Sequence, residues 1–296
     1  ATIQKPAEES VAPPLPPPAE APDASAAPDS APSPSPEPVS PAPAAPEVIV
    51  PEWPPTSPIG QWRFDASGDN QVSGGPAAEK YGDAFFQPGG GVFGGFAYIK
   101  GDKEGIKGAI RISHHSTLHL PTAYTIEFWV RERTEAKAVR NLIYKGSGLN
   151  YNFRIFQEAG QATKAGQTAA GYTEAASGTW KEVRGPNELS YGAWHHVAFT
   201  KSASGIAYYI DGALIASDTA SSDAQLTTTD IVIGESMDDT DFDNLRIYNY
   251  GLTAGQVLYN YQATSPVGQA PTVEQQLANI ATALSVIAGK VAALFQ

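Results

Sequence analysis

Short stretches of alternating apolar and polar residues run through the second half of the chain. WHHVAFT at 194–200 has apolar side chains on one face, which is typical of a half-buried strand. IAYYIDGALIA at 206–216 predicts two strands joined at Asp211-Gly212, because both residues tolerate the positive φ angles of a tight hairpin turn. IVIGE at 231–235 and DNLRIYN at 243–249 predict further strands, so this region should form antiparallel β-structure.

Three similar motifs precede these in the chain: QWRFD at 61–65, YTIEFWV at 124–130 and LIYKG at 142–146. Together with WHHVA at 194–198 and the segment 242–252, they resemble the successive strands of laminin-G-like, or concanavalin-A-like, jelly-roll domains. The resemblance covers residues 59–265 and implies an all-β fold in which two sheets pack as a sandwich. The family includes both ligand-recognition modules and glucanases, so the resemblance predicts the fold more narrowly than the function.

Residues 1–58 have a different composition, with 19 of the 25 prolines of the chain and mostly Ala, Ser, Glu and Asp between them. Because proline lacks the amide donor that helices and sheets need, we expect a disordered, extended Pro/Ala-rich arm. With one lysine and eight acids, this arm carries −7 of the total charge of −12. We interpret it as an acidic stalk that holds the folded part away from an anchor. A disordered tail without a partner is the alternative.

Residues 266–296 consist of a linker and a predicted amphipathic α-helix. Its apolar positions alternate spacings of four and three residues, which is the heptad pattern of a coiled coil. With leucine at one core position and isoleucine at the other, parallel coils favour trimers or tetramers over dimers. We predict that the helix drives self-association, with docking onto its own sandwich or onto a larger assembly as the alternative. The predicted contact residues are Val273, Leu277, Ile280, Leu284, Ile287, Val291 and Leu294.

The composition argues against several classes of protein. The chain has no cysteine, so neither disulfides nor thiol catalysis can operate in it. A net charge of −12 argues against nucleic-acid binding, which requires a basic surface. No run of about 18 apolar residues is present, so we expect no membrane span. The first residue is alanine rather than methionine, which we attribute to processing or trimming, and we expect an extracellular location on a cell or virion surface.

The catalytic signatures expected of an enzyme with this fold are missing. In the glucanase branch of the family, both catalytic carboxylates come from one strand as Glu-x-Asp-x-x-Glu. Here the strand that begins at Tyr124 carries Glu127 and Glu132, but it has Trp129 where the central acid should be. No Gly-x-Ser-x-Gly nucleophile motif occurs, although residue order alone leaves a Ser-His-Asp triad open. We therefore predict that the protein is not an enzyme, with a glycoside hydrolase as the minor alternative.

An acidic segment at 238–244 predicts a calcium site. It holds four carboxylates and an amide within seven residues, and calcium takes six to eight oxygen ligands. The resemblance also implies calcium, which many laminin-G-like domains carry in loops at one end of the sandwich. A solvated acidic loop is the alternative, and we interpret the five histidines as ordinary surface and core residues rather than metal ligands. The predicted calcium ligands are Asp238, Asp239, Asp241, Asp243 and, from the first strand, Asp65.

One tryptophan stands apart from the others. Trp62, Trp129 and Trp194 match core positions of the family, so we expect them to be buried. Trp180 lies instead in the polar segment SGTWKEVRG at 177–185, where an exposed indole ring favours contact with a sugar or a protein partner. Folding back onto the domain is the alternative. The predicted ligand-binding residues are Trp180, Tyr172, Tyr191, Lys181 and Arg184.

These features combine into one functional hypothesis. We predict a non-enzymatic recognition module that binds carbohydrate or a surface receptor, is displayed through its acidic arm, and becomes multivalent through its C-terminal helix. The competing hypothesis is a structural decoration subunit of a capsid, fibre or filament, in which the arm and the helix serve assembly. The two differ in whether the region around Trp180 is open or is covered by neighbouring subunits.

Overall fold

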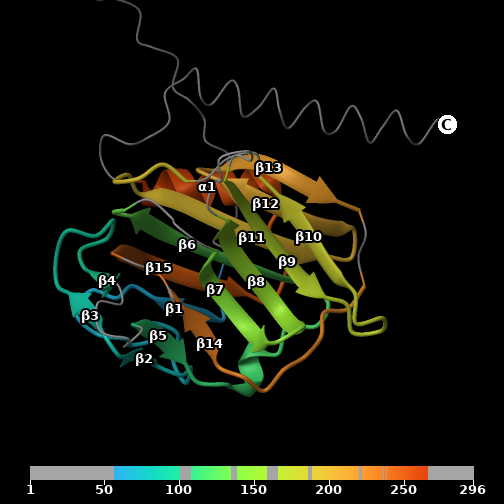
Figure 1. Ribbon diagram of the computed structural model, residues 1–296, viewed down its shortest axis with the longest axis horizontal. Coiled ribbons are helices and arrows are strands. Elements are labelled where there is room, and N and C mark those ends of the chain that lie inside the picture. The colour runs from blue at the N-terminus through green and yellow to red at the C-terminus, as the bar shows by residue number, and fades with distance from the viewer. Residues whose placement is uncertain are drawn as a thin grey trace, which may run out of the picture. The chain divides into compact units, whose positions relative to one another are not determined.

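The computed structural model describes residues 57–100, 108–134, 139–158, 166–185, 189–219, 222–235, 237 and 239–265. The predicted arm up to residue 56 and the predicted heptad residues from Val273 to Leu294 lie outside the described residues. Within them, the chain forms two antiparallel sheets that pack face to face, which confirms the predicted all-β sandwich (Figure 1). No helix among the described residues is long and apolar enough to cross a membrane.

One sheet has eight strands. Along the sheet they run in the order β13-β12-β11-β6-β15-β4-β3, and β1 also pairs with β15. The bounds are β1 (Gly60–Trp62), β3 (Ala84–Gln87), β4 (Phe96–Ile99), β6 (Tyr124–Glu132), β11 (His195–Ser202), β12 (Gly205–Ile210), β13 (Ala213–Asp218) and β15 (Thr240–Tyr248). The motifs at 61–65, 124–130, 194–198 and 242–252 therefore all contribute to this sheet.

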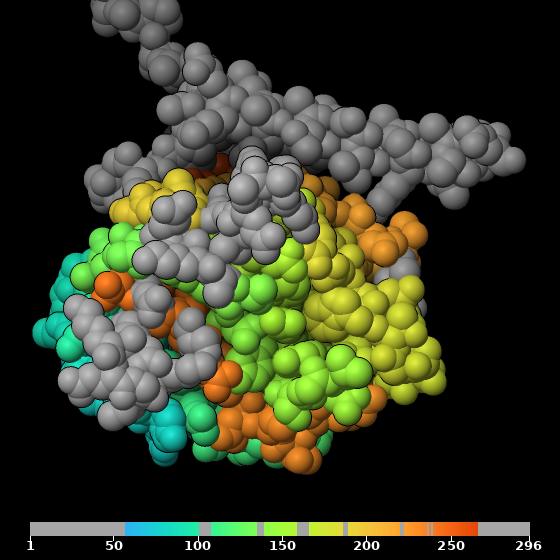
Figure 2. All heavy atoms as spheres, viewed as in Figure 1, coloured from blue at the N-terminus to red at the C-terminus, as the bar shows by residue number. Residues whose placement is uncertain are grey.

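The other sheet has seven strands in the order β10-β9-β8-β7-β14-β5-β2. Figure 1 shows β7, β8, β9 and β10 side by side on the face toward the viewer, and Figure 2 shows the atoms of this face in green to yellow. The bounds are β2 (Ala78–Tyr81), β5 (Ala109–Ile112), β7 (Arg140–Ser147), β8 (Asn150–Glu158), β9 (Gln167–Thr173), β10 (Trp180–Arg184) and β14 (Ile231–Ile233). The described residues also form two short helices, η1 (Ser116–Leu118) and α1 (Ala254–Thr264).

The core lies between the two sheets, where the alternating apolar residues of both inner faces meet. Trp62, Phe128, Phe153 and Phe199 are at most 2% exposed there. Each such side chain contributes about 1.5–3 kcal/mol through its removal from water, so this cluster supplies most of the stability. The prediction that Trp62 and Trp129 are buried is confirmed. Trp194, expected in the core, is instead half-buried with the Arg131 guanidinium over its ring.

The hairpin predicted at Asp211-Gly212 joins β12 to β13. Asp211 and Gly212 have φ angles of 51° and 75°, as a tight turn between twisted antiparallel strands requires. A side chain at Gly212 would approach Tyr261 of α1 to 2.8 Å, so the glycine also lets this turn pack against the helix.

Helix α1 covers the outer face of the eight-stranded sheet. It starts with a capping box, in which Thr253 and Gln256 satisfy each other's free backbone N–H groups. Its Val257 joins Tyr209, Tyr248 and Leu252 in a second apolar cluster on this face. The sequence analysis did not anticipate this helix, although Thr253-x-x-Gln256 is its N-terminal motif.

Candidate functional site

The seven-stranded sheet carries a row of outward-facing side chains, one on each strand. In an antiparallel sheet, residues directly opposite each other share a face, so the register determines which side chains line up. The central members of the row, Arg154, Tyr144 and Arg111, are partly exposed. From β10 to β2 the row consists of Glu182, Gly171, Arg154, Tyr144, Val232, Arg111 and Glu79.

A hollow of about 410 Å³ opens next to this row, where the β7–β8 turn meets the start of β10. Trp180 and Tyr151 form its aromatic wall, with ring centroids 5.9 Å apart in an edge-to-face arrangement. Leu149, at the tip of the turn, is 84% exposed. We call this site the aromatic hollow; its lining residues are Gly148, Leu149, Tyr151, Arg154, Gly178 and Trp180.

Local backbone chemistry fixes the indole ring of Trp180. Gly171 lies under it, and a Cβ at that position would be 2.8 Å from the ring and 2.2 Å from the carbonyl oxygen of Lys181. The indole N–H donates to Glu182 at 2.7 Å. Because that N–H already has its acceptor, the ring offers an apolar face to the hollow.

Arg154 supplies the positive charge in the aromatic hollow. Its guanidinium lies over Phe156 at 4.3 Å and over Tyr151 at 5.4 Å from the ring centroids. Its Nε donates to the amide oxygen of Asn141 at 2.8 Å. These three contacts hold the guanidinium plane in one orientation, which reduces the entropy lost when a ligand binds it.

Tyr144 continues the row beyond Arg154. Its hydroxyl donates to Glu235, and its ring meets that of Tyr151 edge-on at 5.9 Å. Burial and the hydrogen bond to Glu235 raise the pKa of the Tyr144 hydroxyl, so it stays protonated. The face thus combines ring surfaces with a few directed polar groups, which is the usual composition of a small-ligand site.

The predicted ligand residues are not all in this place. Trp180 lines the hollow as expected, and Arg184 lies on the same face but pairs with Glu158 and Glu182. Lys181 lies opposite the core residue Tyr172, so the alternation of the strand directs it to the other face. Tyr172 is 0% exposed and cannot meet a surface ligand. That part of the prediction is wrong.

Tyr191 is exposed but lies in the turn that leads into β11, a strand of the other sheet. The residues that the sequence analysis missed in the hollow are Leu149, Tyr151 and Arg154. A regular alternation along β8 does not place Tyr151 and Arg154 on one face, because their spacing is odd. The register shift between Lys145 and Gly146 brings them together, and Gly146 with φ 142° is the sequence feature behind it.

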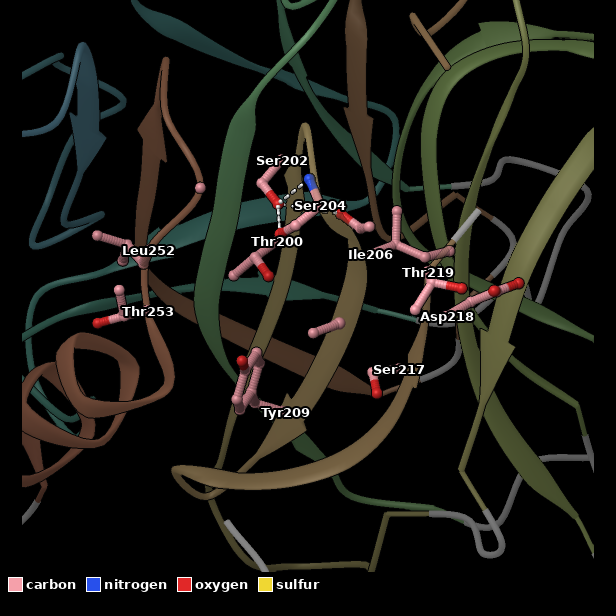
Figure 3. Close-up of a pocket in the computed structure, with 13 residues that line it drawn as sticks. Thr200, Ser202, Ser204, Ile206, Tyr209, Ser217, Asp218, Thr219, Leu252 and Thr253 are labelled. Carbon is pink, nitrogen blue, oxygen red and sulfur yellow. Dashed lines mark hydrogen bonds between the residues drawn. The ribbon is translucent and has the colours of Figure 1, made fainter. Parts of the chain in front are cut away.

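A second hollow, of about 290 Å³, lies on the eight-stranded sheet between β11, β12, β13 and the loop before α1 (Figure 3). Figure 3 shows mainly hydroxyl groups around it, and its aromatic residue, Tyr209, is 5% exposed. Serine hydroxyls here bond to each other, as Ser202 and Ser204 do at 2.8 Å. We call it the hydroxyl groove; its polar lining includes Thr200, Ser202, Ser204, Ser217, Asp218, Thr219 and Thr253.

The predicted calcium ligands are dispersed among separate partners. Asp241 is fully buried and pairs with Arg131 and Arg133 at 2.7 and 2.9 Å. Asp239 accepts the Tyr98 hydroxyl, and Asp238 lies outside the described residues. In the part of the chain that the structure describes, no three His, Asp or Glu side chains converge as metal ligands would. The acidic segment therefore does not form one common ligand set there.

Asp65 and Asp243 do lie close to each other, on either side of the glycine-rich loop 91–95. Asp243 accepts the N–H groups of Val92 and Phe93 at 2.7 and 3.0 Å, and Asp65 accepts that of Gly95 at 2.9 Å. Burial, with a smaller contribution from the charge of Asp65, raises the pKa of Asp243 to about 7 against the lowering effect of these N–H groups.

Glu127 is part of a buried polar cluster under α1. Its carboxylate is 2.8 Å from the Arg246 Nε and accepts hydrogen bonds from Tyr248 and Asn260 at 2.8 and 3.0 Å. Burial opposes ionisation, but Arg246 first, then His196 and Tyr248, lower the pKa of Glu127 to about 2. The carboxylate is thus ionised, its charge is balanced by Arg246, and helix α1 covers it.

Ser190, His195 and Asp211 form a chain of hydrogen bonds. Ser190 Oγ is 2.7 Å from His195 Nε2, and His195 Nδ1 is 2.7 Å from Asp211 Oδ2. Burial lowers the pKa of His195, but Asp211 raises it by more. A catalytic triad also needs free N–H donors for an oxyanion, and the nearby amides of Gly192 and His196 already donate to Glu132 and Asp211. We interpret the chain as a brace between the β12–β13 turn and the segment before β11.

His114 and His119 also meet, with their Nε2 atoms 3.2 Å apart and their rings stacked. Lys145 reaches the other nitrogen of His114 at 3.1 Å. Burial and the nearby Lys145 lower the pKa of His114, so this histidine is neutral at neutral pH. The pair fits the interpretation of the histidines as hydrogen-bonded residues.

Comparison with known proteins agrees with this architecture. The family model described as concanavalin A-like lectin/glucanases superfamily (Laminin_G_3) matches residues 104–258, which is more than half of the chain. No curated protein sequence shows a significant match.

Solved structures with the same fold include domain 4 of a GH43 extracellular arabinanase from Geobacillus stearothermophilus in complex with arabinotriose. It has a TM-score of 0.53 and 20% identity, over 70% of this chain and 98% of that domain. The binding domain of botulinum neurotoxin DC in complex with SialylT has a TM-score of 0.57 and 10% identity, over 70% and 50% of the two chains. The same domain in complex with rat synaptotagmin II has a TM-score of 0.54 and 12% identity, over 71% and 52%. The chain thus spans about half the length of these neurotoxin domains, and at such identities the likeness shows a shared fold.

Proposed function

Because this chain belongs to the concanavalin A-like lectin/glucanase superfamily, we propose that its sandwich is a non-enzymatic recognition module that binds carbohydrate in the aromatic hollow. The single observation that carries the proposal is the fixed, partly exposed ring of Trp180 beside Tyr151 and Arg154 in a hollow of about 410 Å³. Sugars bind to aromatic faces with a few directed hydrogen bonds, and this hollow offers both.

The surroundings of the hollow support this interpretation. Leu149 is 84% exposed at its rim. An exposed apolar side chain next to an indole ring is typical of a binding surface, because a bound ligand removes both from water. Domain 4 of the arabinanase and the neurotoxin DC domain were solved with arabinotriose and SialylT. Both structures share the fold with this chain. They support carbohydrate as the class of ligand and do not identify the particular sugar.

The test is a glycan array with the full chain, followed by calorimetric titration of the best ligand. Trp180→Ala should weaken binding by about 5-fold or more, since truncation of an aromatic residue that carries a binding site costs more than about 1 kcal/mol. Phe85→Ala is the matched control, because Phe85 is an exposed ring (40%) on β3 of the other sheet. Binding that survives Trp180→Ala unchanged would overturn the placement of the site.

The surroundings of Glu127 support a recognition role over hydrolysis. Glu127 lies on β6, the strand that lacks the central acid of the glucanase pattern, and its charge is balanced by Arg246 beneath α1. A hydrolase would need two accessible carboxylates facing one bond. The check is product analysis by mass spectrometry after prolonged incubation with each bound glycan. Reducing-end products that disappear in a carboxylate variant would favour the enzyme instead.

We further propose that the module is displayed outside the cell and is multivalent, with the predicted arm at 1–58 as a stalk and the helix predicted within 266–296 as an oligomeriser. The apolar heptad spacing supports self-association, and linked weak sites gain avidity. Sedimentation of the full chain against a chain that ends at Ser265 tests this. A trimer or tetramer that becomes monomeric on truncation is the expected result. Two monomers would favour docking of the helix onto a partner, as in a structural subunit.

Calcium is a narrower proposal, centred on Asp65 and Asp243. The support is the pair of adjacent carboxyl groups and the buried Oδ1 of Asp243, which has no hydrogen-bond partner. A bound cation stabilises the folded state by a free energy that rises with the logarithm of its concentration over its dissociation constant. Thermal unfolding with calcium and with chelator measures it. The expected upward shift with calcium should vanish in Asp243→Asn, and equal melting in both conditions would remove calcium from the site.

A further inference from the structure

On the open face of the seven-stranded sheet, the carboxylates bond to groups other than Arg154 and Arg111. Glu158 and Glu182 both pair with Arg184, at 2.8 and 2.6 Å. Glu182 also accepts the indole N–H of Trp180, and Glu235 accepts the hydroxyl of Tyr144. Each of these acids therefore already has its partner. Glu79 on β2 lies opposite Arg111, but among the described residues the two form no ion pair.

Two arginines of the row are left over. Among the described residues, neither Arg154 nor Arg111 forms an ion pair with a carboxylate. Arg154 bonds through Nε to the neutral amide of Asn141, which leaves the N–H donors of its two Nη groups. Arg111 lies over the ring of Tyr81 at 4.2 Å, and its buried Nε has no hydrogen-bond partner.

The geometry of Arg154 suits a carboxylate. A guanidinium can hold a carboxylate with two parallel N–H···O bonds, and such bonds are about twice as strong as neutral ones. Phe156 and Asn141 already fix the plane of Arg154, so little freedom is lost when a ligand binds. Arg154 lines the same hollow as Trp180, so one ligand can contact the ring and the guanidinium together.

From this arrangement we infer that the ligand of the aromatic hollow is an acidic sugar, whose ring contacts Trp180 while its carboxylate binds Arg154. The inference rests on the proposed carbohydrate-binding function and adds the ligand's charge. Arg111 is three strands farther along the row, about 14 Å away at the spacing of neighbouring strands. A chain with more than one carboxylate, lying across the strands, can therefore reach both arginines.

The experiment uses two matched pairs of probes on the full chain. One pair is 3′-sialyllactose and the methyl ester of its sialic acid carboxylate, and the other is trigalacturonate and its methyl ester. In each pair the carboxylate is the main difference, and comparison between the pairs distinguishes a sialic acid from a uronic acid. We expect the acidic member of at least one pair to bind about 10-fold or more tightly than its neutral match, since hydrogen bonds to charged groups add about that factor. Its affinity should also fall as salt is raised.

Variants separate this inference from the function on which it rests. Arg154→Gln should reduce binding of the acidic probe to the level of the neutral one and leave the neutral one unchanged. Lys100→Gln is the matched control, because it removes one exposed positive charge at the end of β4, away from the row. Trp180→Ala should weaken both probes. Equal wild-type affinity for both members of each pair would overturn the acidic ligand and leave carbohydrate binding intact. No binding to these probes or to any glycan of the array would remove the function itself.

Discussion

The two outer faces of the sandwich use the same kinds of residue in opposite ways. On the eight-stranded sheet, Arg246 is paired with Glu127, and helix α1 closes over both. On the seven-stranded sheet, Arg154 lies between rings, bonds to a neutral amide and lines an open hollow. Both arginines are held in fixed orientations by their neighbours. They differ in whether the folded chain itself provides the countercharge.

This difference separates residues that stabilise the fold from residues available to a ligand. A buried charge without a partner costs several kcal/mol, so a covered face must balance its charges internally. An open face can leave a guanidinium without a carboxylate, because water solvates it until a ligand arrives. The face that lacks internal countercharge is therefore where we expect binding, and the covered face is where we expect stability to depend on single residues.

The largest effect should come from removing the countercharge on the covered face. Glu127→Ala leaves Arg246 buried without a carboxylate, and such a change costs about 3–5 kcal/mol of folding free energy. Urea unfolding monitored by tryptophan fluorescence measures it. Glu79→Gln is the control, because Glu79 is an exposed carboxylate at the edge of the open face, and it should change stability by less than about 0.5 kcal/mol. Similar losses in both variants would contradict the distinction between the two faces.

Acid should weaken the covered face in a defined range of pH. The pKa of Glu127 is about 2 in the folded protein against a model value of 4.5, so its carboxylate stabilises the fold above pH 4.5. That contribution, about 3 kcal/mol for a shift of this size, should be lost as the pH falls from 4.5 to 2. Unfolding free energies of the wild type and of Glu127→Gln should therefore converge over this range. If the two curves of unfolding free energy against pH run parallel instead, Glu127 is not ionised in the folded protein.

On the open face, Gly171 should matter through the position of Trp180. A Cβ at Gly171 would lie 2.2 Å from the carbonyl oxygen of Lys181, so Gly171→Ala must push β10 away. Overpacking of this kind costs about 1–3 kcal/mol, and the displaced ring should also bind glycan more weakly. Thermal unfolding and glycan titration measure the two effects. Gly89→Ala is the control, since a Cβ there meets nothing within 4 Å. Full glycan affinity in Gly171→Ala would show that the ring position is not critical.

The sequence predicted the covered part of the molecule better than the open part. Strand motifs such as YTIEFWV and the Asp211-Gly212 hairpin are local patterns, and the structure confirms both. Trp180 could be recognised because it is an apolar residue in a polar segment. Arg154 and Tyr151 could not, because a register shift at Gly146 decides which face they share. Tyr172 was misassigned for a different reason: the regular alternation of β9, rather than residue type, buries it.

The smallest effect should come from the hydroxyl groove, which is a hollow without an accessible ring. Its aromatic residue, Tyr209, is 5% exposed, and its serines bond to one another, so a sugar would replace these hydrogen bonds without gaining a stacking surface. Ser217→Ala should therefore change glycan affinity by less than about 2-fold, which corresponds to about 0.4 kcal/mol of binding free energy. Titration with the same ligand as for Trp180→Ala makes the comparison direct. A large loss in Ser217→Ala, with Trp180→Ala unaffected, would move the binding site to the eight-stranded sheet and reverse the roles of the two faces.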